Sequence, residues 1–295
     1  MTENVEYKRS TVSPVIRAVI LQLVILILIV IWLIPAYTMI INGFKSNTLI
    51  QSAEPTLVPP SIGTLLAFKE EWASLQGPIV NSMEVIIPVA VISTVFGSMA
   101  AYFFDMLSNS FSQRLRILSN AAFAVIALGT FMPYQATLMP LTRLMADLGG
   151  LETYWGLLFS FLIFYLPTGA LLMSIFMSVV PARLSEAARL DGAGDLRIFF
   201  RVILPAVMPG FIATLIFIFI MSWNVFFIPL VLVTNPASQL VPVTVMSLTG
   251  GFATLYNETF ATAVLASIVP LALFIFMGRY FIRGLMALGS GGKGL

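Results

Sequence analysis

The sequence predicts an all-α protein with about six transmembrane helices. Of its 295 residues, 59% are hydrophobic and 9% are charged, whereas soluble domains carry about 25% charged residues. Largely charge-free runs of the ~20 residues that a helix needs to cross a bilayer recur along the chain. They fall at roughly residues 18–41, 85–102, 117–139, 154–180, 207–232 and 259–278.

The first run contains one strongly polar residue, Gln22, before its last turn. Its length of about 24 residues exceeds the apolar core of a signal peptide, and no small-residue cleavage motif follows promptly, so we expect it to stay as a membrane anchor. Residues 42–78 then carry several prolines and a cluster of charges. We expect this stretch to form a small exposed lobe outside the membrane.

Charged or turn-rich segments separate the middle and last spans. In the span at 85–102, the small residues Gly97, Ser98, Ala100 and Ala101 favour close helix packing over a pore. Residues 202–257 contain no charge, but the turn residues at 234–239 would leave backbone groups unsatisfied in lipid. We therefore expect one span at 207–232, a long loop, and a last span at 259–278.

The distribution of basic residues predicts the orientation, because cytoplasmic loops are rich in Lys and Arg. With the N-terminus inside, three basic residues lie outside, at Lys45, Lys69 and Arg143. The other twelve lie inside, at Lys8, Arg9, Arg17, Arg114, Arg116, Arg183, Arg189, Arg197, Arg201, Arg279, Arg283 and Lys293. Both termini are expected in the cytoplasm. The net charge of +2 predicts no nucleic-acid partner.

The longest predicted cytoplasmic connection spans residues 181–205. Its sequence predicts a helix, a turn and a second helix. Pro181 suits the first turn, and residues 182–190 are almost all good helix formers. Residues 191–194 supply a break, Asp195 can cap a second short helix, and Pro205 would stop that helix from continuing unbent into the next span.

This connection resembles the EAA loop of ATP-binding-cassette (ABC) importer permeases. The family pattern is EAA, three residues, G, nine residues and I-x-L-P, and only Val202 departs from it, in place of Ile. The matching residues are Glu186, Ala187, Ala188, Gly192, Leu204 and Pro205. Spacing, cytoplasmic placement and position before the last two spans all agree.

Four further stretches resemble carbohydrate-uptake permeases related to the maltose MalG subunit, a group of binding-protein-dependent transport system inner membrane components. They lie at residues 42–46, 132–135, 222–224 and 279–284. The resemblance covers about residues 15–286 and implies the MetI/MalG-like permease fold. The expected organisation is a cytoplasmic tail at 1–17, a transmembrane domain at 18–286 and a flexible tail at 287–295.

In that family the EAA loop forms a coupling helix that docks in a cleft of a cytoplasmic ATPase. Carried over, Glu186 is the polar contact and Gly192 makes the turn. The full set of coupling residues is Glu186, Ala187, Ala188, Asp191, Gly192, Leu204 and Pro205. The alternative is that Glu186 pairs with Arg189 or Arg183 on an exposed helix, which would contribute only ~0.3–0.5 kcal/mol.

No nucleotide site is predicted on this chain. The tail at 289–294 lacks the first Gly and the Ser/Thr of a phosphate-binding loop, and no strand precedes it. ATP and Mg²⁺ are therefore expected on a partner, and no other cofactor, metal or catalytic residue is predicted. The resemblance implies a second homologous permease, a dimeric ATPase and an extracytoplasmic solute-binding protein as partners, with membrane lipid around the helices.

Polar groups inside a membrane are costly unless they face a cavity or a partner. This points to Asn81, Tyr134, Gln135, Trp223 and Asn224 as candidates for the substrate path. Interhelical hydrogen bonding or packing is the alternative for each. The loop at 234–257 resembles the outer loop that such permeases offer to the binding protein, and a plain connector would be shorter.

The predicted function is a permease subunit that moves a sugar or oligosaccharide across the cytoplasmic membrane of a prokaryote, with ATP hydrolysed elsewhere. A sugar-like polar solute such as a glycerol phosphate ester is an alternative. A secondary transporter is a rival, although no span carries a charge near its centre. A membrane-embedded assembly or sensor protein without transport is another.

Overall fold

A computed structural model describes residues 13–52, 56–60, 63–109, 112–247 and 255–290, and all regular structure in these ranges is helical. The helices are α1 (Pro14–Gly43), α2 (Asn47–Gln51), α3 (Leu66–Ser108), α4 (Gln113–Thr130), η1 (Tyr134–Thr137), α5 (Leu138–Asp147), α6 (Tyr154–Met177), α7 (Ala182–Leu190), α8 (Asp195–Ile198), η2 (Phe199–Ile203), α9 (Leu204–Ala206), α10 (Met208–Trp223), α11 (Phe227–Leu232), η3 (Pro236–Ser238), α12 (Val241–Ser247) and α13 (Tyr256–Ser290). The predicted tail residues 1–12 and 291–295 lie outside the described ranges.

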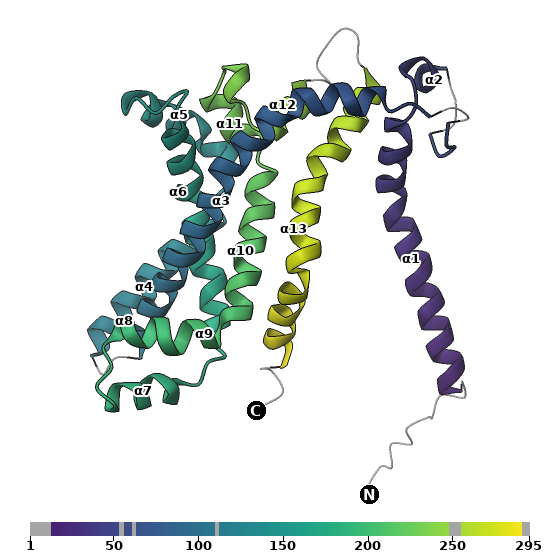
Figure 1. The fold of residues 1–295 in the computed structure, drawn as a ribbon. Coiled ribbons are helices and arrows are strands. Elements are labelled where there is room, and N and C mark those ends of the chain that lie inside the picture. Colours follow the sequence, from purple (N-terminus) through teal and green to yellow (C-terminus); the bar gives the residue numbers. More distant parts are fainter. Residues whose placement is uncertain (1–12, 53–55, 61–62, 110–111, 248–254, 291–295) are drawn as a thin grey trace, which may run out of the picture.

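Within the described ranges, four helices are long and apolar enough to cross a membrane, and six spans result if each of two bent pairs counts as one. The bent pairs are α4 with η1–α5, at 92°, and α8–α9 with α10, at 82°. This confirms the predicted fold class. In Figure 1, α7, α8 and α9 lie at one end of the bundle, together with the start of α1 and the end of α13, and α2, α5 and α12 lie at the other. We refer to these as the α7 end and the α12 end.

The centre of the bundle is the contact between α3 and α6, where two glycines face each other. A Cβ atom on Gly97 would lie 2.5 Å from the backbone carbon of Gly169, and one on Gly169 would lie 2.2 Å from the Ser93 carbonyl oxygen. Small residues let helix backbones approach this closely. Around the contact, α10 and α13 pack against α3, and Leu75, Phe161, Ile218 and other buried apolar side chains form the main core.

The helix α1 stands apart from the bundle (Figure 1), and its most apolar stretch has no buried residue. It joins the rest only near its C-terminus. There, Gly43 lies against the Phe68 ring, which is 4.7 Å from the Phe44 ring between centroids. The apolar length of α1 is thus available to lipid or to another protein.

The exposed lobe predicted at 42–78 is confirmed only before Leu66, where the described residues from Asn47 on are exposed or half-buried. Its second half is wrong, because α3 begins already at Leu66 and packs across the top of α13 (Figure 1). Lys45 is fully buried, and the Glu71 carboxylate, 5% exposed, accepts a hydrogen bond of 2.9 Å from the Thr262 hydroxyl on α13. The Asn42 amide donates to the carbonyl oxygens of Thr38 and Thr56. Polar contacts therefore tie α3 to α13, and the end of α1 to the segment that precedes α3.

Two of the helices end before the predicted spans do. In the span predicted at 117–139, α4 ends at Thr130, because Pro133 disfavours helical geometry at the residue before it and has no N–H to donate. In the span predicted at 207–232, α10 ends at Trp223, and Pro229 could not donate to the Val225 carbonyl in a continuous helix. The first break lies beside the middle of α6, where Thr130 and Tyr134 line a cavity with Phe164 and Thr168. In contrast, α13 continues to Ser290, beyond the predicted boundary at 286.

Replacing Gly97 by Ala should lower the free energy of unfolding by about 1–3 kcal/mol, since the added methyl group meets backbone that cannot move aside cheaply. The measurement is the thermal unfolding midpoint of the detergent-solubilised protein. Gly77→Ala is the matched control on α3, because nothing lies within 4 Å of its Cβ position; we expect it to be neutral or to stabilise by up to ~1 kcal/mol. Equal midpoints for both variants would contradict the proposed close contact.

Candidate functional site

Residues 181–205 form a bent arm at the α7 end, which we call the coupling segment. Its first helix, α7, spans Ala182–Leu190 as predicted, and the turn is made by Gly192 at φ +77°, a conformation that L side chains rarely adopt. The Gly192 and Ala193 amides donate to the carbonyl oxygens of Arg189 and Ala188, which closes the end of α7. The predicted helix and turn are therefore confirmed.

The prediction that Asp195 caps the second helix is wrong, since Gly194 holds the cap position and Asp195 is the first helical residue. The Asp195 carboxylate instead accepts a hydrogen bond of 3.1 Å from the Arg189 guanidinium, forming an ion pair across the turn. This pair also takes up one of the two partners suggested for Glu186. Within the described ranges, the exposed Glu186 forms no ion pair.

The second half of the coupling segment is anchored in the bundle. Ile198, Phe199 and Ile203 are buried in a cluster with Met173 and Phe176 of α6. Phe199–Ile203 forms a π-helical turn, η2, and the chain then bends at Val207, between Pro205 and Pro209. Pro205 thus lies just before the bend.

The first half of the coupling segment is held less firmly, through the half-buried Ala188, which packs against the same cluster. The helix α7 contains no buried residue, and Leu190 at its C-terminus is 90% exposed. Of the predicted coupling residues, Glu186, Ala187, Asp191, Gly192 and Pro205 are exposed, and Ala188 and Leu204 are half-buried. They lie together on one protruding arm (Figure 1), whose exposed surface is free to contact another molecule.

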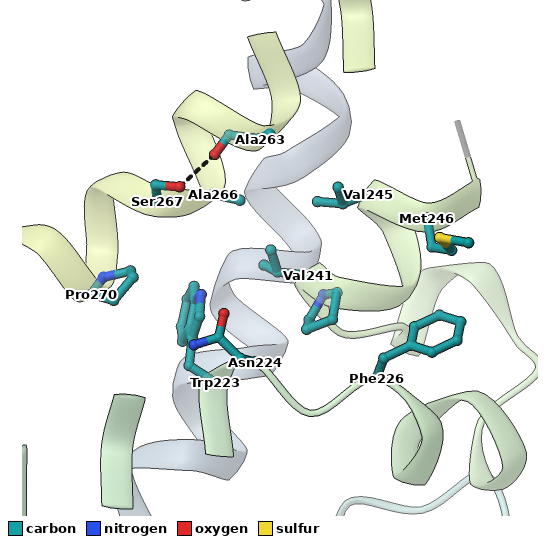
Figure 2. A pocket seen from close by; sticks show the side chains of 11 residues that line it. Trp223, Asn224, Phe226, Val241, Val245, Met246, Ala263, Ala266, Ser267 and Pro270 are labelled. Atoms are coloured by element: carbon teal, nitrogen blue, oxygen red, sulfur yellow. Dashed lines mark hydrogen bonds between the residues drawn. The ribbon is translucent and has the colours of Figure 1, made fainter. Parts of the chain in front are cut away.

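The predicted path residues are distributed over several places. Figure 2 shows the cavity that contains Trp223 and Asn224, which lies between the end of α10, α12 and α13 and has a volume of about 350 Å³. Trp223 is 4% exposed and stacks on Phe219, while the Asn224 amide donates to the Ile220 carbonyl. The cavity thus combines aromatic and proline surfaces with one amide and the Ser267 hydroxyl.

A second cavity, of about 340 Å³, lies beside the break after α4. Tyr134 lines it with Tyr165 and Thr168 of α6, and the Tyr134 ring packs edge-on against Phe164. Gln135 is exposed on η1. Because the helix breaks before Tyr134, both residues lie past the bend and not inside a continuous span.

Asn81 lies at the α12 end and holds a loop. Its amide donates to the carbonyl oxygens of Ala237 and Gln239, at 2.9 and 3.1 Å. The neighbouring Ser82 hydroxyl accepts a hydrogen bond of 2.9 Å from the Val241 amide. These contacts fasten the loop before α12 to α3, which is the hydrogen-bonding alternative considered for Asn81. Gly250 and Gly251 of the predicted docking loop lie outside the described residues.

Glu152 also holds this loop in place. Among the described residues it is the non-glycine residue with a positive φ, at 58°. Its carboxylate accepts hydrogen bonds from the Thr234 hydroxyl and from the backbone N–H groups of Thr234 and Asn235. These hydrogen bonds, chiefly that from the Thr234 hydroxyl, hold the pKa of the Glu152 carboxyl below its ordinary value. The ionised carboxylate thus stays in place below neutral pH.

Sequence reasoning missed Glu152 and Tyr102, a buried tyrosine of α3 beside the coupling segment. Glu152 and Thr234 are 82 residues apart in the chain, and no local motif marks either one. The positive φ of Glu152 could not be predicted from the residue type, because glutamate rarely adopts it. Only the packing of the spans brings these groups to their partners.

Fold and site together define a polytopic helical membrane protein with a protruding arm at one end and a fastened loop at the other. Residues 93–286 match the family described as binding-protein-dependent transport system inner membrane component. The chain belongs to this family. The resemblance seen in the sequence is thereby confirmed, and the chain is a transport component of the membrane.

Two relatives span most of this chain. The glucose import system permease protein GlcU of Saccharolobus solfataricus is 55% identical over 96% of this chain and 98% of that protein. The melibiose/raffinose/stachyose import permease protein MelC of Bacillus subtilis is 30% identical over 74% of this chain and 78% of that protein. Among solved structures, a bacterial ABC transporter involved in import of the acidic polysaccharide alginate shares the fold, with a TM-score of 0.72 and 21% identity over 90% of this chain and 96% of that chain.

Glu152→Gln should speed hydrogen exchange of the Thr234 and Asn235 amides by about three- to tenfold at pH 7, because a neutral amide accepts these hydrogen bonds less strongly. Since the pKa of Glu152 is lowered in the folded protein, its contribution is complete above the ordinary value of about 4.3 and is lost only as the pH falls through the lowered value. Glu70→Gln, exposed at the same end, is the control. If the Thr234 and Asn235 amides exchange as slowly in Glu152→Gln as in the wild type, Glu152 does not hold this loop in place.

Proposed function

We propose that this chain is one permease subunit of an ABC importer that moves a sugar or oligosaccharide into the cell. The observation that carries the proposal is the 55% identity to a glucose import permease over nearly the full length of both chains. The melibiose/raffinose/stachyose permease supports the same substrate class. The cavity with Trp223 and Asn224 suits it as well, because aromatic faces stack on the C–H surfaces of sugars and amides pair with hydroxyl groups.

In this proposal the energy comes from a separate ATPase that docks on the coupling segment. The exposed α7 and the turn at Gly192 support this role. Moving a two-state gate from 1:99 to 99:1 requires about 5.5 kcal/mol of differential binding, whereas one exposed ion pair contributes ~0–1 kcal/mol. Glu186 alone is therefore insufficient. Ala187, Ala188, Asp191 and Gly192 act with it as one docking surface, and Leu204 and Pro205 connect that surface to α10.

The α7 end then faces the cytoplasm of a prokaryotic cell, with both termini on that side. The α12 end faces outward, and its loop, fastened by Asn81 and Glu152, is presented to an extracytoplasmic solute-binding protein. The exposed apolar helix α1 and the incomplete enclosure of both cavities support pairing with a second, homologous permease. ATP and Mg²⁺ are held by the ATPase pair.

The orientation is tested by cysteine labelling, which is clean because the chain has no native Cys. Ser178 lies exposed at the α7 end and Ser247 lies exposed at the α12 end. We expect a membrane-impermeant maleimide to label Ser247→Cys in intact cells and Ser178→Cys only in inside-out vesicles. Labelling of both variants from the same side would contradict the six-span arrangement, and the reversed pattern would contradict the orientation.

The function is tested in proteoliposomes that contain the complete complex with its binding protein. The wild-type complex should take up labelled glucose or a glucose oligosaccharide only with ATP inside. Gly192→Pro should abolish ATPase association and lower uptake more than tenfold, because proline fixes φ near −65° and cannot adopt the native +77°. Glu186→Lys should weaken association by reversing the charge of the docking surface.

The matched control is Gly194→Ala, two residues further along. Gly194 has φ −74° and open space at its Cβ position, so alanine fits without strain. Association and uptake should stay at the wild-type level. If Gly192→Pro also retains both, α7 is not the docking surface. If the wild-type complex moves sugar without ATP, the importer assignment is wrong.

A further inference from the structure

Besides their contacts with α6, α8 and η2 pack on one tyrosine of the transmembrane helix α3. The Tyr102 ring is 9% exposed and packs against Phe199 of η2, with 5.6 Å between ring centroids. Phe199 and Ile198 are at most 2% exposed, and they share an apolar cluster with Tyr102. Although α7 has no buried residue of its own, it touches this cluster through Ala188. Movement of α7 therefore reaches α3 through the cluster, in which Tyr102 is the residue of α3 that stacks on Phe199.

The hydroxyl of Tyr102 lies next to the charges that join α7 to α8. It lines a cleft of about 880 Å³ together with Glu186, Arg189 and Asp195. The Arg189 guanidinium is near enough to act on the hydroxyl as a hydrogen-bond donor, and the Asp195 carboxylate acts on it electrostatically, but in the described part of the chain neither group reaches it with normal hydrogen-bond geometry. A buried hydroxyl without a partner is costly, and a purely structural position would be better filled by Phe.

The other end of the same helix holds the loop of the α12 end. Asn81 and Ser82 bind the backbone of Ala237, Gln239 and Val241. The 20 residues from Ser82 to Tyr102 correspond to ~30 Å of helix, which is about the thickness of the hydrocarbon core. Between them, the contact of Gly97 with Gly169 supports α3 against α6. One continuous helix therefore connects the coupling segment to the loop on the opposite side.

We propose that Tyr102 is a positioning residue that transmits movement of the coupling segment to α3, and through α3 to the loop at 237–241. Its ring holds η2 against α3. A movement of α7 that brings the Arg189–Asp195 pair into normal hydrogen-bond geometry with its hydroxyl would lower the free energy of the moved position at this residue, as a coupling element requires. The inference rests on the proposed function, because the load on α7 comes from the docked ATPase.

The test is Tyr102→Phe in the complete reconstituted complex, with sugar uptake and ATP hydrolysis measured in the same vesicles. This substitution keeps the ring contact with Phe199 and removes only the Tyr102 hydroxyl, which forms no hydrogen bond of normal geometry within the described ranges. We expect unchanged ATPase association and equal or higher thermal stability, with uptake per ATP hydrolysed lowered about fivefold or more, the size of a typical coupling between sites. A merely structural role would leave that ratio unchanged.

Tyr280→Phe is the control, because it deletes a tyrosine hydroxyl at the same end, where Arg279 is the donor. Its uptake per ATP should equal that of the wild type. The double variant Tyr102→Phe with Asp195→Asn should lose no more than Asp195→Asn alone, since both changes act on one unit. An uptake-to-ATP ratio of Tyr102→Phe within twofold of wild type, or independent effects in the double variant, would overturn the inference. Absence of ATP-driven uptake in the wild-type complex would instead overturn the proposed function.

Discussion

The close contact of α3 with α6 is the constraint on which the rest of the structure depends. At Gly97 and Gly169 the two backbones approach so closely that neither position can hold a side chain. In a membrane, helix association depends on such packing, because lipid offers no hydrophobic gain. The other spans of the core, α10 and α13, pack on the pair, and the coupling segment leaves directly from the end of α6. A wider separation would move every one of these elements.

Two helices, α1 and α7, pack only weakly on the rest of the described chain. The helix α1 exposes its apolar length, and α7 exposes a polar surface with Leu190 at its end. The first suits hydrocarbon or another membrane helix, and the second suits an aqueous protein partner. A permease working as one part of a larger assembly accounts for both, since each element is incomplete in the isolated chain.

The breaks in the spans create the cavities. Where α4 and α10 end, the backbone turns away from the bundle axis and leaves space beside Tyr134 and beside Trp223. Proline explains where α4 stops, because Pro133 lacks the N–H that a continuing helix would use. Non-helical backbone is tolerated inside a membrane protein where it lines a cavity or is buried in protein. The same positions were read from sequence as the interior of continuous spans, because hydropathy averages over a break of three residues.

Hydropathy, charge distribution and local motif spacing determined the class of this protein from its sequence. They predicted the helical membrane fold, the helix at 182–190 and the turn at Gly192, because each depends on neighbours within a few residues. Tertiary structure decided the rest. The Glu152 carboxylate finds Thr234 across 82 residues, and Tyr102 meets Phe199 only when α3 packs beside the coupling segment. Such contacts follow from how the spans pack, which composition and periodicity do not encode.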